Sequence, residues 1–146
     1  MQSLYFAYGS NLLSARMRER VPSAAARGPA RLSGWRLTTD KRGKDGTGKA
    51  NLRREPAAAV WGVVWAIDPA EWPQLDRLEG GYARVEVEVE TPAGTRLRAA
   101  TYASDRLTAA PVLDRGYKRA IVDGAREHGL PEAWIAALEA LPQIED

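Results

Sequence analysis

The feature that most constrains the fold is an apolar run that begins at Leu4, ends in Gly9-Ser10-Asn11 and passes at once into a helical pattern. A strand–turn–helix unit of this kind leaves several N–H groups at the helix start without partners in the helix, and the helix dipole adds partial positive charge there. Gly9 allows close backbone approach, and Ser10 or Asn11 can cap the helix. The turn is therefore a candidate site for a carboxylate or a developing oxyanion, although an ordinary, well-capped connection has the same pattern.

Length and composition exclude several classes of site. The 146 residues suit one domain, residues 1–146, and the apolar and charged fractions of 45% and 27% are typical of a soluble globular protein. The absence of cysteine excludes disulfides, a thiolate nucleophile and cysteine metal sites. One histidine, His128, is too little for a histidine zinc site or a Ser-His-Asp triad, and we expect it on the surface near a helix end. Without a signal peptide or a membrane-spanning run, we expect a cytoplasmic protein that does not contact a membrane.

Charge is nearly balanced, with 21 basic and 19 acidic side chains. Basic residues gather at Arg16, Arg18 and Arg20, which we expect to be solvated at a helix end, and again within residues 41–54. Neither group alternates with aromatic residues, so nucleic-acid binding is a weak alternative. Residues 40–49 contain no apolar side chain and predict a mobile, exposed loop.

Part of that loop imitates a phosphate-binding loop. Residues 43–49 fit G-x-x-x-x-G-K, but Ala50 follows where a magnesium-binding hydroxyl is needed. No buried strand precedes the segment and no helical pattern follows it. The sequence therefore argues against nucleotide binding here.

Periodicity predicts four further strands and four helices. The strands are expected at residues 30–38, 60–67, 82–90 and 96–103, with 60–67 buried on both faces and 82–90 paired with 96–103. One helix ends before Pro22, a short one spans residues 73–79 after a capped turn at Asp68, a third ends near His128, and the last starts at Pro131.

The phase of the short helix singles out Glu79. Trp72, Leu75 and Leu78 mark its apolar face, and Glu79 lies four residues beyond Leu75 on the same side. Burial and the C-terminal end of the helix dipole would both raise the pKa of this carboxyl group, as a general acid/base near neutral pH requires. The alternative is that Glu79 reaches solvent at a frayed end or pairs with an arginine.

Four segments, at residues 5–13, 61–65, 75–80 and 124–131, together resemble the γ-glutamylcyclotransferase family in order and spacing. The resemblance implies an α+β fold: a small mixed, largely antiparallel, closed or nearly closed β-barrel with flanking helices. It implies conversion of a small-molecule γ-glutamyl substrate into 5-oxoproline and a free amine by attack of the substrate's own α-amine, without metal or cofactor. It also suggests a homodimer.

Carried over by position, Glu79 resembles the family's catalytic acid/base. The other positions that resemble its binding residues are Tyr5, Phe6, Ala7, Tyr8, Gly9 and Ser10, with Asn11 adjacent, and the cavity tyrosines Tyr82, Tyr102 and Tyr117. Tyr-Gly-Ser-Asn is similar to γ-glutamylcyclotransferase itself, whereas the glutathione-specific and γ-glutamylamine branches resemble Tyr-Gly-Ser-Leu and Tyr-Gly-Thr-Leu. The loop before Ala50 departs from the family, because Lys49 and other polar residues replace more apolar ones. The identity of the leaving group therefore stays undetermined. Removal of a γ-glutamyl cap from a biosynthetic intermediate and a non-catalytic binding module are the alternatives.

Overall fold

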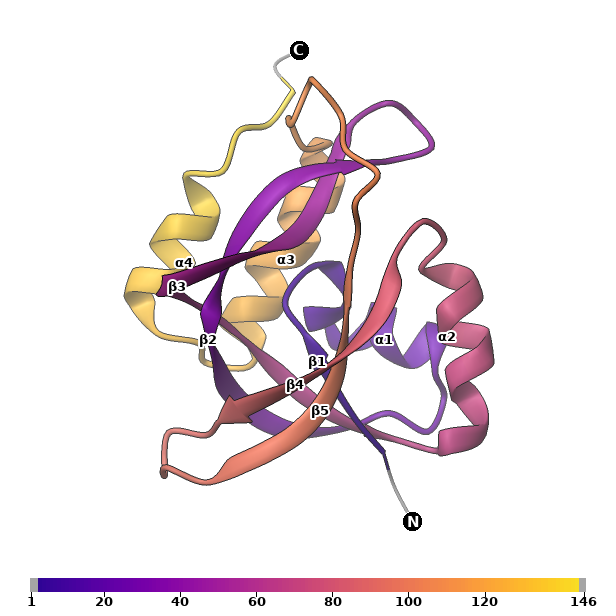
Figure 1. The fold of residues 1–146 in the computed structure, drawn as a ribbon, viewed down its shortest axis with the longest axis vertical. Coiled ribbons are helices and arrows are strands. Elements are labelled where there is room, and N and C mark those ends of the chain that lie inside the picture. Colours follow the sequence, from indigo (N-terminus) through magenta and orange to yellow (C-terminus); the bar gives the residue numbers. More distant parts are fainter. Residues whose placement is uncertain (1–2, 145–146) are drawn as a thin grey trace.

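Two long strands form most of a closed five-stranded barrel in the computed structural model, which describes residues 3–144 (Figure 1). The strand order is β1-β3-β2-β4-β5, and the β1–β5 pair that closes the barrel is parallel while the other pairs are antiparallel. This confirms the predicted mixed barrel. The strands are β1 (Ser3–Ala7), β2 (Ala25–Arg42), β3 (Gly48–Ile67), β4 (Ala83–Glu90) and β5 (Arg96–Ala103).

Helices flank the barrel, with α3 and α4 packed together on one side and α2 on the other (Figure 1). Asp68 accepts a hydrogen bond from the Ala70 N–H and caps the turn before α2, as predicted. None of the helices within residues 3–144 is long and apolar enough to cross a membrane. The helices are η1 (Ser10–Leu12), α1 (Ser14–Arg20), η2 (Pro69–Glu71), α2 (Trp72–Leu78), α3 (Arg115–Glu127) and α4 (Glu132–Glu139).

The apolar half of β3 lies at the centre of the core. Residues 60–67 are buried except for Trp61, which is partly exposed, and β1 and β2 pair with the two edges of this segment. The predicted β4–β5 pair is also present, with Arg96 bridging Glu88 and Glu90 across the strands. These elements are therefore confirmed.

The polar segment at residues 40–49 is not the loop that its composition predicts. Both long strands extend into it, and only a short turn, in which the Gly43 N–H donates to the Thr47 carbonyl, separates them. Asp40 accepts two hydrogen bonds from Arg53 across the hairpin, and Lys41 is only 7% exposed. Hydrogen bonding between the two backbones compensates for the missing apolar residues.

Two side-chain expectations are wrong. Leu78, the last residue of α2, is 48% exposed, and it lines an open pocket together with Glu79. His128 lies at the end of α3, as predicted, but its side chain is only 11% exposed rather than on the open surface: its Nε2 is 3.1 Å from the Ser14 hydroxyl, and its ring packs edge-on against Trp65. The C-terminus of α3 thus contacts the start of α1.

Candidate active site

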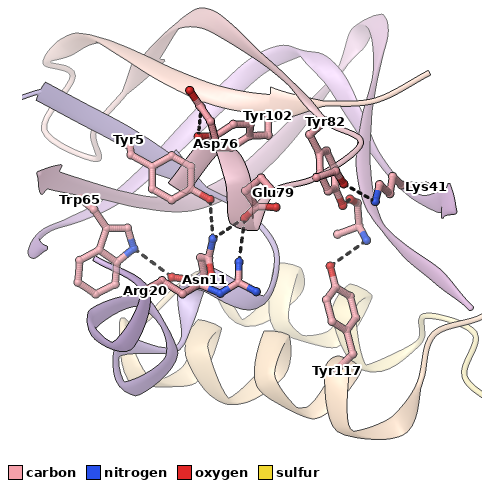
Figure 2. Close-up of polar contacts among 12 residues, drawn as sticks. Tyr5, Asn11, Arg20, Lys41, Trp65, Asp76, Glu79, Tyr82, Tyr102 and Tyr117 are labelled. Atoms are coloured by element: carbon pink, nitrogen blue, oxygen red, sulfur yellow. Dashed lines mark hydrogen bonds and ion pairs between the residues drawn. The ribbon is translucent and has the colours of Figure 1, made fainter. Parts of the chain in front are cut away.

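A pocket forms where the end of β1, the end of α2 and the start of α3 meet (Figure 2). Five of its ten lining residues are tyrosines. Its lining residues are Tyr5, Tyr8, Gly9, Ser10, Asn11, Ala50, Glu79, Tyr82, Tyr102 and Tyr117. Residues more than 100 positions apart in the sequence thus share one small space.

Phe6 and Ala7, two of the predicted binding residues, do not line this pocket. Successive side chains of a strand face opposite sides, so Phe6 faces away from the pocket that Tyr5 lines. Phe6 is fully buried on that other side. Ala7 is also fully buried within the hydrophobic core. Both residues belong to the barrel wall.

Glu79 lies at the C-terminal cap of α2, where its N–H donates to the Leu75 carbonyl at 2.9 Å. Its side chain is 15% exposed, and Oε1 accepts a hydrogen bond from the Asn11 side-chain amide at 2.8 Å. The Arg20 guanidinium lies 3.4 Å from the same oxygen. The carboxyl group is therefore both buried and paired with an arginine, which the sequence offered as alternatives.

Burial raises the pKa of Glu79 above its ordinary value, because the charged form loses water. Arg20 and the hydrogen bond from Asn11 act in the opposite direction, as do the more distant charges of Arg16 and Lys41. The predicted direction is confirmed. Desolvation is the largest cause.

The sequence predicts that Ser10 or Asn11 caps a helix, and neither side chain does so. Gly9 occupies the cap of η1, and neither η1 nor α1 has a side-chain cap. Instead the Asn11 amide joins Glu79 to the Tyr5 hydroxyl, which it contacts at 3.0 Å. The Asn11 carbonyl accepts from the Trp65 indole, so the residue is fixed on both sides.

Two tyrosine hydroxyls hold the backbone of Ala50 against the pocket. The Tyr82 hydroxyl donates to the Ala50 carbonyl at 2.6 Å, and the Ala50 N–H donates to the Tyr117 oxygen at 3.0 Å. Burial raises the pKa of Tyr117 to about 12 and raises the pKa of Tyr82 further. Both phenols are therefore neutral and act as hydrogen-bonding groups rather than bases.

The remaining tyrosines link the pocket to the barrel. The Tyr8 hydroxyl donates to the Tyr102 carbonyl, and the Tyr102 hydroxyl donates to Asp76, each at 2.6 Å. Burial also raises the pKa of Tyr5, of Tyr8 and of Tyr102. Within the part of the chain that the structure describes, Glu79 is the only carboxyl group that lines the pocket.

Sequence reasoning missed the cations beside this carboxyl group. Arg20 is held because α2 packs on the end of α1, where Gln74 donates to the Arg20 carbonyl at 2.7 Å. Lys41 donates to the Gly80 carbonyl at 2.9 Å and lies 4.7 Å from the centre of the Tyr82 ring. The spacing of Arg16 and Arg20, one turn apart on α1, was the available signal that they share a face.

Comparison with known proteins gives consistent results. The AIG2-like family matches residues 59–138, more than half of the chain. Gamma-glutamylcyclotransferase from Homo sapiens is 37% identical over 94% of this chain and 78% of its own length, and the Mus musculus protein is 36% identical over 97% and 80%. A solved structure named gamma-glutamyl cyclotransferase superposes with a TM-score of 0.93 at 33% identity, covering all of this chain and 91% of that one. The chain therefore belongs to the γ-glutamylcyclotransferase family.

Proposed function

We propose that this protein is a γ-glutamylcyclotransferase that converts γ-glutamyl amino acids, or related γ-glutamyl compounds, into 5-oxoproline and the free amine. The observation that carries the proposal is the buried Glu79 carboxyl group, which is bonded to Asn11 beside the Gly9-Ser10 turn. The named relatives support the same reaction.

Glu79 acts as the general acid/base. Its carboxylate takes a proton from the substrate's α-ammonium, and the neutral amine attacks the γ-carbonyl carbon. A new C–N bond closes the five-membered ring and gives a tetrahedral oxyanion. Glu79 transfers the proton it holds to the leaving nitrogen as the bond from carbon to that nitrogen breaks and the carbonyl re-forms. The ring nitrogen gives its second proton to the freed Glu79 carboxylate, which passes it to the released amine or to solvent. No protein nucleophile takes part, which agrees with a sequence that has no cysteine.

The pocket favours the folded glutamyl chain that this reaction needs. Holding the amine against the carbonyl supplies the entropic advantage of an intramolecular reaction. The first N–H groups of η1, at Ser10 and Asn11, have no partner within that helix and can bind either the oxyanion or the substrate α-carboxylate. The neutral tyrosine hydroxyls supply further polar contacts.

Direct assay of 5-oxoproline tests this proposal. The protein is incubated separately with γ-glutamyl-alanine, glutathione and γ-glutamyl-lysine, and 5-oxoproline is measured by mass spectrometry. Release from at least one of them supports the cyclotransferase, and the preferred compound reports the leaving group. A protein that binds these compounds without releasing 5-oxoproline would be a binding module instead.

Replacing Arg20 by Gln should move the acid limb of the kcat–pH profile to higher pH. The base form of Glu79 is lost as pH falls through its pKa, and Arg20 lowers that pKa. Without the guanidinium the pKa rises, so activity is lost earlier on acidification. Arg36→Gln, at an exposed arginine of β2 outside the pocket lining, is the control and should keep the wild-type profile. An unchanged limb in Arg20→Gln would contradict the role of Arg20.

We further propose that residues 1–146 form a single γ-glutamylcyclotransferase-like domain, and that the protein is a cytoplasmic homodimer acting in glutathione metabolism without nucleic acid. The family resemblance supports these assignments. Light scattering of the purified chain tests the homodimer, since a monomeric mass at micromolar concentration would contradict it.

A further inference from the structure

A basic vestibule lies outside the pocket and shares Ser10, Glu79, Tyr82 and Tyr117 with it. It lies between α1, the end of α2 and the β2–β3 turn. Figure 2 shows two of its cations, Arg20 beside Glu79 and Lys41 beside Tyr82. The cationic side chains that line it are Arg16, Arg20, Lys41, Lys44 and Lys49.

The charge of the vestibule is strongly unbalanced. Five cationic side chains face two carboxyl groups, those of Asp45 and Glu79. This local excess is larger than the net charge of +2 for the whole chain. A concave site lined by one sign of charge attracts ligands of the opposite sign.

Some of these cations already have partners and some do not. Lys49 pairs with Asp45 at 3.4 Å, and Lys41 uses the Gly80 carbonyl. The Nε of Arg16 is buried and has no hydrogen-bond partner within residues 3–144, and Lys44 is exposed at the tip of the turn. Burial, together with neighbouring cations, lowers the pKa of both Arg16 and Lys41. An anionic group that binds here would give the Arg16 Nε a partner and would offset the repulsion among the cations.

The position of the cations assigns them to the leaving group. None of the lysines and arginines within residues 3–144 lines the inner pocket where the glutamyl chain would fold. Glu79 stands at the boundary and hands its proton to the departing nitrogen, so the rest of the leaving group extends into the vestibule. An ordinary amino acid places one carboxylate there, which leaves part of the positive charge unmatched.

We propose that the vestibule selects γ-glutamyl substrates whose leaving amine carries at least two carboxylates, as in γ-glutamyl-glutamate. This inference rests on the proposed cyclotransferase function. It names Arg16, Lys44 and Lys49 as residues that determine the leaving group.

A matched pair of substrates tests the selection. γ-Glutamyl-glutamate and γ-glutamyl-glutamine have nearly the same shape and differ by one negative charge. We expect kcat/KM for 5-oxoproline release to favour γ-glutamyl-glutamate by about tenfold at low salt, mainly through KM, as one added charged hydrogen bond predicts. The ratio should fall as ionic strength rises, because the vestibule is open to solvent.

Variants of the vestibule locate the effect. Arg16→Gln and the double variant Lys44→Gln/Lys49→Gln should each lower the ratio, whereas Arg96→Gln, on the β4–β5 hairpin, should keep it. Lys44 lies at an exposed tip, so its variant keeps the test valid if Arg16→Gln folds poorly. Equal rates for both substrates would overturn the selection and leave the cyclotransferase standing. Absence of 5-oxoproline from both, and from γ-glutamyl-alanine, would overturn both proposals.

Discussion

Replacing Glu79 by Gln should lower kcat by at least about 100-fold, because the amide can neither accept the ammonium proton nor protonate the departing amine. The fold should be kept, since Gln has nearly the same shape and retains an oxygen for the Asn11 amide. The steady-state rate of 5-oxoproline release from the preferred γ-glutamyl substrate measures the effect. KM should change much less than kcat, because the lost interaction belongs to proton transfer.

The stability of the same variant provides a second readout. Folding raises the pKa of the Glu79 carboxyl group. The native state therefore loses stability as pH rises from the pKa of the unfolded chain to that of the folded protein, and above this range it carries a buried charge at a cost in free energy. At neutral pH, the unfolding temperature of Glu79→Gln in a thermal scan should therefore be at least as high as that of the wild type. Glu86→Gln, the same change at an exposed residue of β4, is the control and should retain full activity. Near-normal turnover in Glu79→Gln would refute the assignment.

The sequence predicts the centre of the barrel better than its extensions. Residues 60–67 and the β4–β5 pair carry strong apolar or alternating patterns, and they form strands as expected. The outer parts of β2 and β3 do not carry such a pattern. Bulges between Ser33 and Trp35 and between Thr38 and Lys41 shift the register, so alternation fails along β2. Their pairing is a long-range property that local composition does not contain.

The site shows the same division. The phase of the α2 helix placed Glu79 against the barrel, because that inference needs only local periodicity. Arg20 resembles any solvated arginine at a helix end until α2 packs on α1. Lys41 resembles a loop residue until the hairpin forms and buries it. The carboxyl group was predictable, whereas the cations that tune its pKa depend on tertiary contacts.

The backbone of the Gly9–Asn11 turn is held in place by a close helix contact that no sequence pattern indicated. Gly124 lies in the last turn of α3, and a Cβ atom there would come within 2.5 Å of the Leu13 nitrogen and 2.6 Å of the Leu12 carbonyl carbon. Glycine in a helix interior usually destabilises it. Here the absent side chain lets α3 pack directly on the backbone of η1, which carries Ser10 and Asn11.

Gly124→Ala should lower the free energy of unfolding by about 1–3 kcal/mol, because the added methyl group meets backbone atoms that cannot move aside without separating α3 from η1. It should also lower kcat in the fully folded fraction, since that separation displaces Asn11 from Glu79. Urea unfolding and 5-oxoproline release measure the two effects. Gly116→Ala is a matched control at an exposed site of α3, where the new Cβ meets only the Asp114 carboxyl oxygen at 3.2 Å. That control should change the free energy of unfolding by no more than about 0.5 kcal/mol, and similar urea midpoints for both variants would contradict the role of Gly124.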